Sequence, residues 1–123
     1  MTIYQEWLFK AKRDLDAAKV LLEKNYCDIA IYHTQQCAEK ALKGYCVYRQ
    51  QPLIKTHDLE RIISICISLD NDFQKIDFFA TCLNGLDVRF RYPDIEFEPT
   101  QSEVTDAIEW AEKVLDFVTN KCL

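Results

Sequence analysis

Glycine and proline are scarce in this chain, which has two glycines and three prolines among its 123 residues. Gly44 and Gly85 lie far apart, so we expect no glycine-rich loop of the kind that binds nucleoside triphosphates. No apolar run approaches the roughly 20 residues that a membrane-spanning helix needs. The first residues, MTIYQEWLFK, lack the charged start and apolar stretch of a signal peptide. These absences predict a cytoplasmic protein with no membrane partner.

The sequence also lacks the spacing typical of metal sites and disulfide frameworks, although it contains six cysteines and two histidines. The cysteines are irregularly spaced, without a CxxC pair or a cysteine–histidine cluster of zinc-site spacing. In a cytosolic protein, such cysteines act as small apolar residues in buried or half-buried positions. We therefore expect no metal and no cofactor. The cysteines are Cys27, Cys37, Cys46, Cys66, Cys82 and Cys122.

The formal net charge of −5 argues against a nucleic-acid binder that depends on bulk positive charge. The charge is uneven, because residues 94–116 hold eight acidic side chains and one lysine. Residues 39–61, in contrast, hold five basic and three acidic side chains. Solvated helix faces are the simpler interpretation of both segments, and a local basic surface is the alternative.

Apolar residues recur at three- and four-residue spacing through most of the chain, which is typical of amphipathic helices. A chain of this length forms one domain by default, so we expect a single helical domain over residues 1–123. Five helices with short connections and no hairpin signal predict an all-α, up-and-down helical bundle. The predicted helices cover about residues 3–24, 27–50, 57–69, 73–88 and 100–121.

Local signals mark where these helices begin and end. Asn25 suits the left-handed position that ends the first helix, and Pro52 cannot continue the second. Thr56 is expected to cap the third helix, and Thr100 with Glu103 forms a capping box before the last. Residues 89–99 contain two prolines and predict a loop.

The segment YHTQQCAEKALK, from Tyr32 to Lys43, carries an ordered set of polar residues within the second predicted helix. On a helix, one polar face would hold Tyr32, Gln35, Gln36, Glu39 and Lys43. We expect this stripe to lie on the outside of the bundle, suited to specific hydrogen bonding. The opposite face, which we expect in the core, holds Ala30, Thr34, Cys37, Ala38, Ala41 and Tyr45.

Five short motifs follow one another along the chain. They are AKRDLDAAKVLLE in the first helix, NYCDIA at the first turn, HTQQCAEKALKGY in the central helix, KTHDL before the third helix, and RYP at 91–93. In this order and spacing they resemble the HEPN domain family over almost the full chain. The resemblance implies a helical bundle that commonly forms homodimers and pairs with a minimal nucleotidyltransferase. It also implies that some members act as toxins, with that partner as antitoxin, and that a nucleotide is a possible ligand.

Members of the wider superfamily cleave RNA with an Arg that is followed, after four to six residues, by a His. Neither Arg89 nor Arg91 has a histidine after it, and seven residues separate Arg49 from His57. Without a nearby imidazole, an arginine can hold a phosphate but cannot act as a general acid or base. We therefore expect no catalytic residue in this chain. An RNA-binding or RNA-cleaving HEPN toxin is the alternative.

Arg91 has two interpretations. It could clamp a phosphate or carboxylate together with Lys40 or Lys43. It could instead pair with Glu39 and tie its loop to the central helix, which is the interpretation we favour.

The histidines and tyrosines have alternatives too. For His33, hydrogen-bonded packing is favoured over contact with a nucleotide, and His57 is expected in the first turn of the third helix in a capping or packing role. Tyr32 and Tyr92 are expected at an interface rather than on a base. The predicted ligand or interface surface consists of Tyr32, His33, Gln36, Glu39, Lys40, Lys43, Arg91 and Tyr92.

Overall fold

The computed structural model describes residues 1–93 and 98–123, so part of the loop expected at 89–99 lies outside the described residues. All regular secondary structure in the described residues is helical, which confirms the predicted all-α bundle. The elements are α1 (Ile3–Glu23), α2 (Cys27–Tyr48), α3 (Leu59–Leu69), the 3-10 helix η1 (Asn71–Ile76), α4 (Asp77–Leu83), α5 (Leu86–Arg89) and α6 (Gln101–Lys121).

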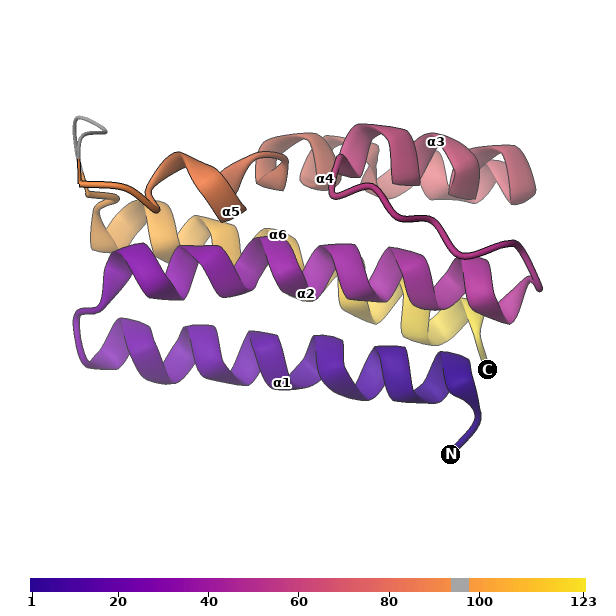
Figure 1. Ribbon diagram of the computed structural model, residues 1–123, viewed down its shortest axis with the longest axis horizontal. Helices are drawn as coiled ribbons and strands as arrows, with labels where there is room; N and C mark the ends of the chain where they lie inside the picture. Colours follow the sequence, from indigo (N-terminus) through magenta and orange to yellow (C-terminus); the bar gives the residue numbers. More distant parts are fainter. Residues whose placement is uncertain (94–97) are drawn as a thin grey trace.

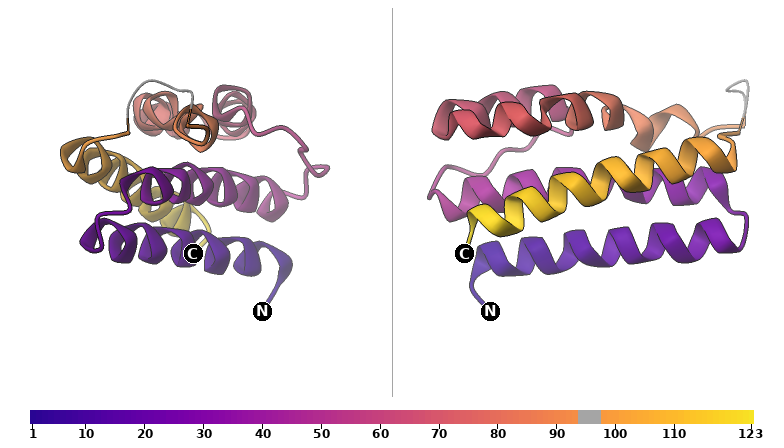
Figure 2. Two further views of the ribbon diagram at one scale, coloured as in Figure 1. Left: turned by 60° about the vertical axis from the view of Figure 1, so that its left-hand side comes forward. Right: turned by 180° about the vertical axis from the view of Figure 1, so that it is seen from behind.

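The long helix α2 lies at the centre of the bundle. It runs antiparallel to α1, and α6 crosses behind it. The shorter helices α3, α4 and α5 lie on the side of α2 opposite α1 (Figure 1). The rotated views in Figure 2 show that both chain ends lie at the same end of the molecule. No helix in the described part of the chain is long and apolar enough to cross a membrane.

Small residues let α1 and α2 approach closely. A Cβ atom on Gly44 would lie 3.1 Å from Trp7 Cβ and 3.4 Å from Leu8 Cδ2, so a larger side chain would push the helices apart. The predicted core face of α2 is confirmed, because its residues are buried: Ala30, Thr34, Cys37, Ala38, Ala41 and Tyr45.

The predicted ends of the first two helices are close to those observed. Asn25 has a positive φ of 62° and follows the end of α1, as expected. The helix α2 ends at Tyr48, and Gln50 adopts a positive φ of 59° before Pro52.

The start of α3 differs from the prediction, and Thr56 is not its cap. The cap is Asp58, whose side chain accepts a hydrogen bond from the Glu60 backbone N–H at 3.0 Å. The Thr56 hydroxyl accepts from the Asp58 N–H at 3.1 Å and so shapes the chain before the helix. His57 therefore precedes α3 and does not lie in its first turn.

The predicted continuous helix over 73–88 was wrong, because the structure divides this segment into η1, α4 and α5. Gly85, with φ of 86°, interrupts it before α5. The side chain of Asn84 accepts a hydrogen bond at 2.9 Å from the backbone N–H of Leu59, the first residue of α3. This hydrogen bond connects the residues between α4 and α5 to the start of α3.

The last helix and the cysteines agree with the predictions. Thr100 and Glu103 form the expected capping box at the start of α6. All six cysteines are free; Cys82 is half-buried and the other five are buried.

Candidate functional site

The first group of candidate residues contacts the buried carboxylate of Glu39, on α2. It accepts hydrogen bonds from Lys43 Nζ at 3.0 Å and Gln35 Nε2 at 3.1 Å. The Nδ1 atom of His57 lies 3.0 Å from both carboxylate oxygens. Positions 35, 39 and 43 follow one another in four-residue steps and therefore share one face of α2, whereas His57 comes from the segment before α3.

The burial of this group overturns the expectation of an exposed polar stripe. Gln35, Glu39 and Lys43 are only 0%, 5% and 6% exposed. Gln36, which donates to Gln35 Oε1 at 2.7 Å, is half-buried. The segment between α2 and α3 runs alongside α2 (Figure 1), and the His57 carbonyl accepts a hydrogen bond from Gln35 at 3.4 Å. Helical spacing predicts which residues share a face but not which segment covers that face.

Two opposing effects set the pKa of the Glu39 carboxyl. Burial alone would raise this pKa, because desolvation disfavours the charged form. Hydrogen bonds from Gln35, Lys43 and His57 act against burial and prevail, so the pKa lies below its ordinary value. The resulting carboxylate balances the charge of Lys43, whose side chain is 7% exposed. The cluster joins the central helix to the segment before α3.

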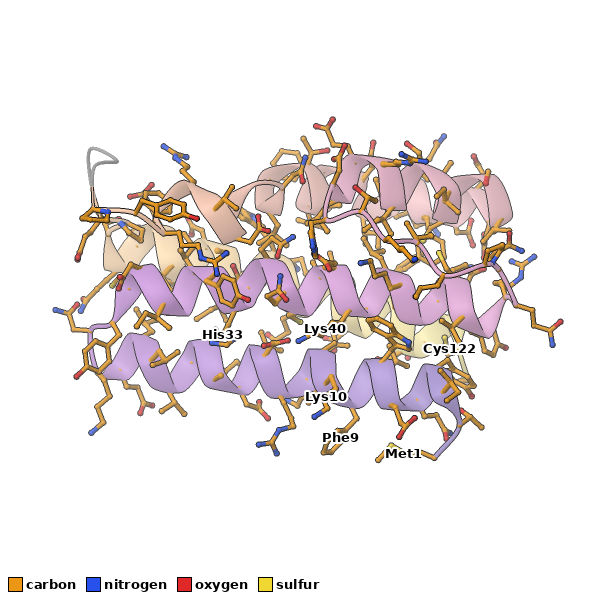
Figure 3. All side chains as sticks on the ribbon, viewed as in Figure 1. Met1, Phe9, Lys10, His33, Lys40 and Cys122 are labelled. Atoms are coloured by element: carbon orange, nitrogen blue, oxygen red, sulfur yellow. The ribbon has the colours of Figure 1, made fainter. Side chains whose placement is uncertain are left out.

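A second carboxylate, Asp14 of α1, contacts both His33 and Lys40 of α2. Lys40 Nζ lies 2.6 Å from Asp14 Oδ2, and His33 Nδ1 lies 2.8 Å from Asp14 Oδ1. Figure 3 shows His33 and Lys40 in the space between α1 and α2. The hydrogen-bonded packing expected for His33 is confirmed. Asp14 was not among the predicted residues, although a polar residue three positions after Ala11 on the apolar face of the helix was a usable signal.

Tyr32 and Arg91 form the third group. The guanidinium carbon of Arg91 lies 5.9 Å from the centroid of the Tyr32 ring, in a cation–π arrangement. The expected pair between Arg91 and Glu39 was wrong, because Glu39 pairs with Lys43 and His57 instead. A cavity of about 230 Å³ lies beside Arg91 and is lined by Asp28, Ile29, Tyr32, Leu86, Asp87, Phe90 and Arg91.

Exposed apolar side chains occur in the segments that line this cavity. Ile29 is 47% exposed, and Val88 and Tyr92, which neighbour lining residues in the sequence, are 50% and 56% exposed. We call the set of Ile29, Tyr32, Val88, Arg91 and Tyr92 the α2–α5 surface. The eight candidate residues are therefore divided among two ion-pair clusters and this surface, and do not form one site.

The two histidines belong to the ion-pair clusters and not to the cavity beside Arg91. Both histidines direct Nδ1 at a carboxylate, and neither lines the cavity that contains Arg91. The side chain of His57 is 71% exposed, and its contact with Glu39 connects the segment before α3 to α2. No group of three or more His, Cys, Asp or Glu side chains that could hold a metal ion occurs among the described residues.

The model of the HEPN domain family matches residues 4–121. The chain belongs to the HEPN family. Two crystal structures align with it along nearly their whole length. The structure of ST0689, an archaeal HEPN homologue, has 27% identity and a TM-score of 0.80, with 100% of both chains covered. The structure of TT1696 from Thermus thermophilus has 28% identity and a TM-score of 0.85, with 98% of this chain and 99% of that chain covered.

A shorter similarity links this HEPN chain to MJ1304 of Methanocaldococcus jannaschii, a protein whose name marks it as a candidate toxin. The two are 51% identical over 35 residues, which is 28% of this chain and 23% of the archaeal protein. The match thus spans less than a quarter of that relative. The two solved structures share the fold of this chain.

Proposed function

We propose that this HEPN protein is an interaction protein: a homodimer that pairs with a minimal nucleotidyltransferase in a toxin–antitoxin-like module. The α2–α5 surface carries the proposal, because exposed Ile29 lines a cavity there and exposed Val88 and Tyr92 neighbour lining residues in the sequence. Exposed apolar groups combined with aromatic and arginine side chains are typical of protein interfaces. The partial similarity to a candidate toxin supports the toxin-like role.

The positions of the histidines support a protein that binds without cutting. Cleavage of a phosphodiester at neutral pH needs an ionisable group beside the scissile bond. His33 is held by Asp14 and His57 by Glu39, so neither accompanies Arg91. Arg91 alone can hold an anion or contact a partner.

RNA binding is the second candidate, and a basic groove favours it. Lys55 and Arg61 line a groove of about 510 Å³ along the segment before α3. Basic side chains of this kind contact phosphates. Among the described residues, the lining contains no aromatic ring on which a base could stack, which makes this candidate the weaker one.

Light scattering and copurification test the leading proposal. We expect the purified chain to have twice its 14.5 kDa mass in solution at micromolar concentration. A minimal nucleotidyltransferase encoded beside the gene should copurify when the two proteins are expressed together. The double variant Ile29→Glu/Val88→Glu should weaken that complex by about tenfold or more, because buried charges oppose an apolar contact.

The control is Phe78→Glu, which changes another exposed large apolar residue, on α4. It should leave the complex intact. A strict monomer that binds no nucleotidyltransferase would refute the proposal. Purified protein that cleaves RNA, and loses cleavage in Arg91→Ala, would support the alternative of an RNA-cleaving toxin.

A further inference from the structure

The cavity between α2 and α5 contains charges of both signs that do not pair with one another. Asp28 lies in the first turn of α2 and Asp87 in the first turn of α5, and both are half-buried. Within the described residues neither carboxylate forms an ion pair, and Arg91 rests over Tyr32 instead. Among the described lining residues, two carboxylates and one guanidinium leave an excess of one negative charge.

Aromatic and aliphatic side chains form the rest of the lining. Tyr32 and Phe90 contribute rings, and Ile29 and Leu86 contribute apolar walls. Carboxylates near aromatic rings attract a cation in two ways, through hydrogen-bonded ion pairs and through the negative faces of the rings. Arg91 already shows that the Tyr32 ring accepts a guanidinium group. The lining therefore has the chemistry of a receptor for a second positive group.

The size of the cavity limits what can enter it. Its volume of about 230 Å³ is below the roughly 300–1,000 Å³ of pockets that enclose whole small-molecule ligands. One long side chain is a suitable occupant. A nucleotide phosphate in this cavity would meet two carboxylates, Asp28 and Asp87, for the one guanidinium of Arg91, and the like charges repel.

We propose that this cavity receives a basic side chain, an arginine or a lysine, from the nucleotidyltransferase partner. The inference rests on the proposed function and specifies the chemistry of the partner. Charge complementarity supports it, because the described lining is negative and partly apolar, and one of its apolar residues, Ile29, is 47% exposed. An anchor in a pocket, surrounded by apolar contacts that exclude water, is the arrangement that carries most of the binding energy in many interfaces.

Titration of the ¹⁵N-labelled chain with N-acetyl-arginine amide tests the cavity alone. We expect saturable shifts of backbone amides at the lining residues. N-acetyl-citrulline amide has nearly the same shape without the charge, and it should bind about fivefold more weakly. AMP should also bind more weakly than the arginine amide. Equal binding of the citrulline compound, preference for AMP, or no saturable response to the arginine compound would overturn the inference.

Two variants assign the effect to the carboxylates. Asp28→Asn/Asp87→Asn should weaken binding of the arginine amide by about fivefold or more while the amide spectrum stays dispersed. The control Asp106→Asn removes an exposed carboxylate on α6 and should bind as the wild type does. Equal binding by the double variant and the wild type would overturn the inference.

The same double variant separates this inference from the proposed function. If the nucleotidyltransferase complex forms and the double variant does not weaken it, the basic anchor is wrong and the interaction function stands. If no complex forms with the wild type, the interaction function fails, and the anchor assigned to that partner fails with it. Binding of the arginine amide would then identify the cavity only as a small cation site.

Discussion

At the scale of single residues, Glu39 connects a buried lysine to the segment before α3. Replacing Glu39 with Gln keeps the shape but leaves the Lys43 ammonium, whose side chain is 7% exposed, without its counter-charge. Breaking a buried pair in this way typically costs about 3 kcal/mol or more. We therefore expect Glu39→Gln to lower the free energy of unfolding by about 3 kcal/mol at pH 7, as measured by urea denaturation followed by circular dichroism.

Two further variants show whether the buried charge is the cause. Glu109→Gln, at an exposed position of α6, should change the free energy of unfolding by less than about 0.5 kcal/mol. Glu39→Leu/Lys43→Met removes both charges and should recover much of the loss, because no unpaired buried charge remains. Glu39→Gln with wild-type stability would contradict the structural role of the pair.

At the scale of elements, the start of α6 depends on two reciprocal hydrogen bonds. The Thr100 hydroxyl accepts from the Glu103 backbone N–H at 3.1 Å, and the Glu103 carboxylate accepts from the Thr100 N–H at 3.0 Å. Thr100→Ala should cost about 1 kcal/mol and lower the melting temperature by roughly 4 °C. Ser102→Ala, two positions further on and exposed, is the matched control. Equal losses in the two variants would show that the cap contributes nothing specific.

At the scale of the whole molecule, the Glu39 cluster predicts how stability depends on pH. The pKa of this carboxyl is lower in the folded protein than in the unfolded chain. Its contribution is therefore complete above the unfolded pKa, about 4.3, and is lost as pH falls through the lower folded value. The difference in the free energy of unfolding between the wild type and Glu39→Gln should therefore still be present at about pH 5, above the pKa of the unfolded carboxyl. It should then shrink toward about pH 3, as urea denaturation at each pH would show; a constant difference over the whole range would refute this assignment.

Much of the helical framework could be predicted because it depends on local spacing. The apolar repeat of α1, the positive φ at Asn25 and the Thr100–Glu103 capping box involve residues within a few positions of one another. The predictions failed where distant segments meet. Asp58, and not the expected Thr56, caps α3, and the hydrogen bond from the Leu59 N–H to the Asn84 side chain forms only once the two segments are folded together.

The candidate site illustrates the same limit. Tyr32, Glu39 and Arg91 were all predicted as site residues, but Arg91 was expected to pair with Glu39. In the structure, His57 and Lys43 occupy the Glu39 carboxylate, and Arg91 rests over Tyr32. Ion pairing depends on distances between segments, and the sequence alone does not define the path of the chain that sets those distances.

The sequence by itself determined that this chain is a helical HEPN bundle, because periodicity and short motifs encode helices and their order. It also determined that no histidine follows Arg91. Only the tertiary structure decided that Gln35, Glu39 and Lys43 are buried and that Asp28, Asp87 and Arg91 share a cavity. The physical reason is that burial and charge pairing are properties of packed segments: a polar helical face becomes interior when another segment lies across it.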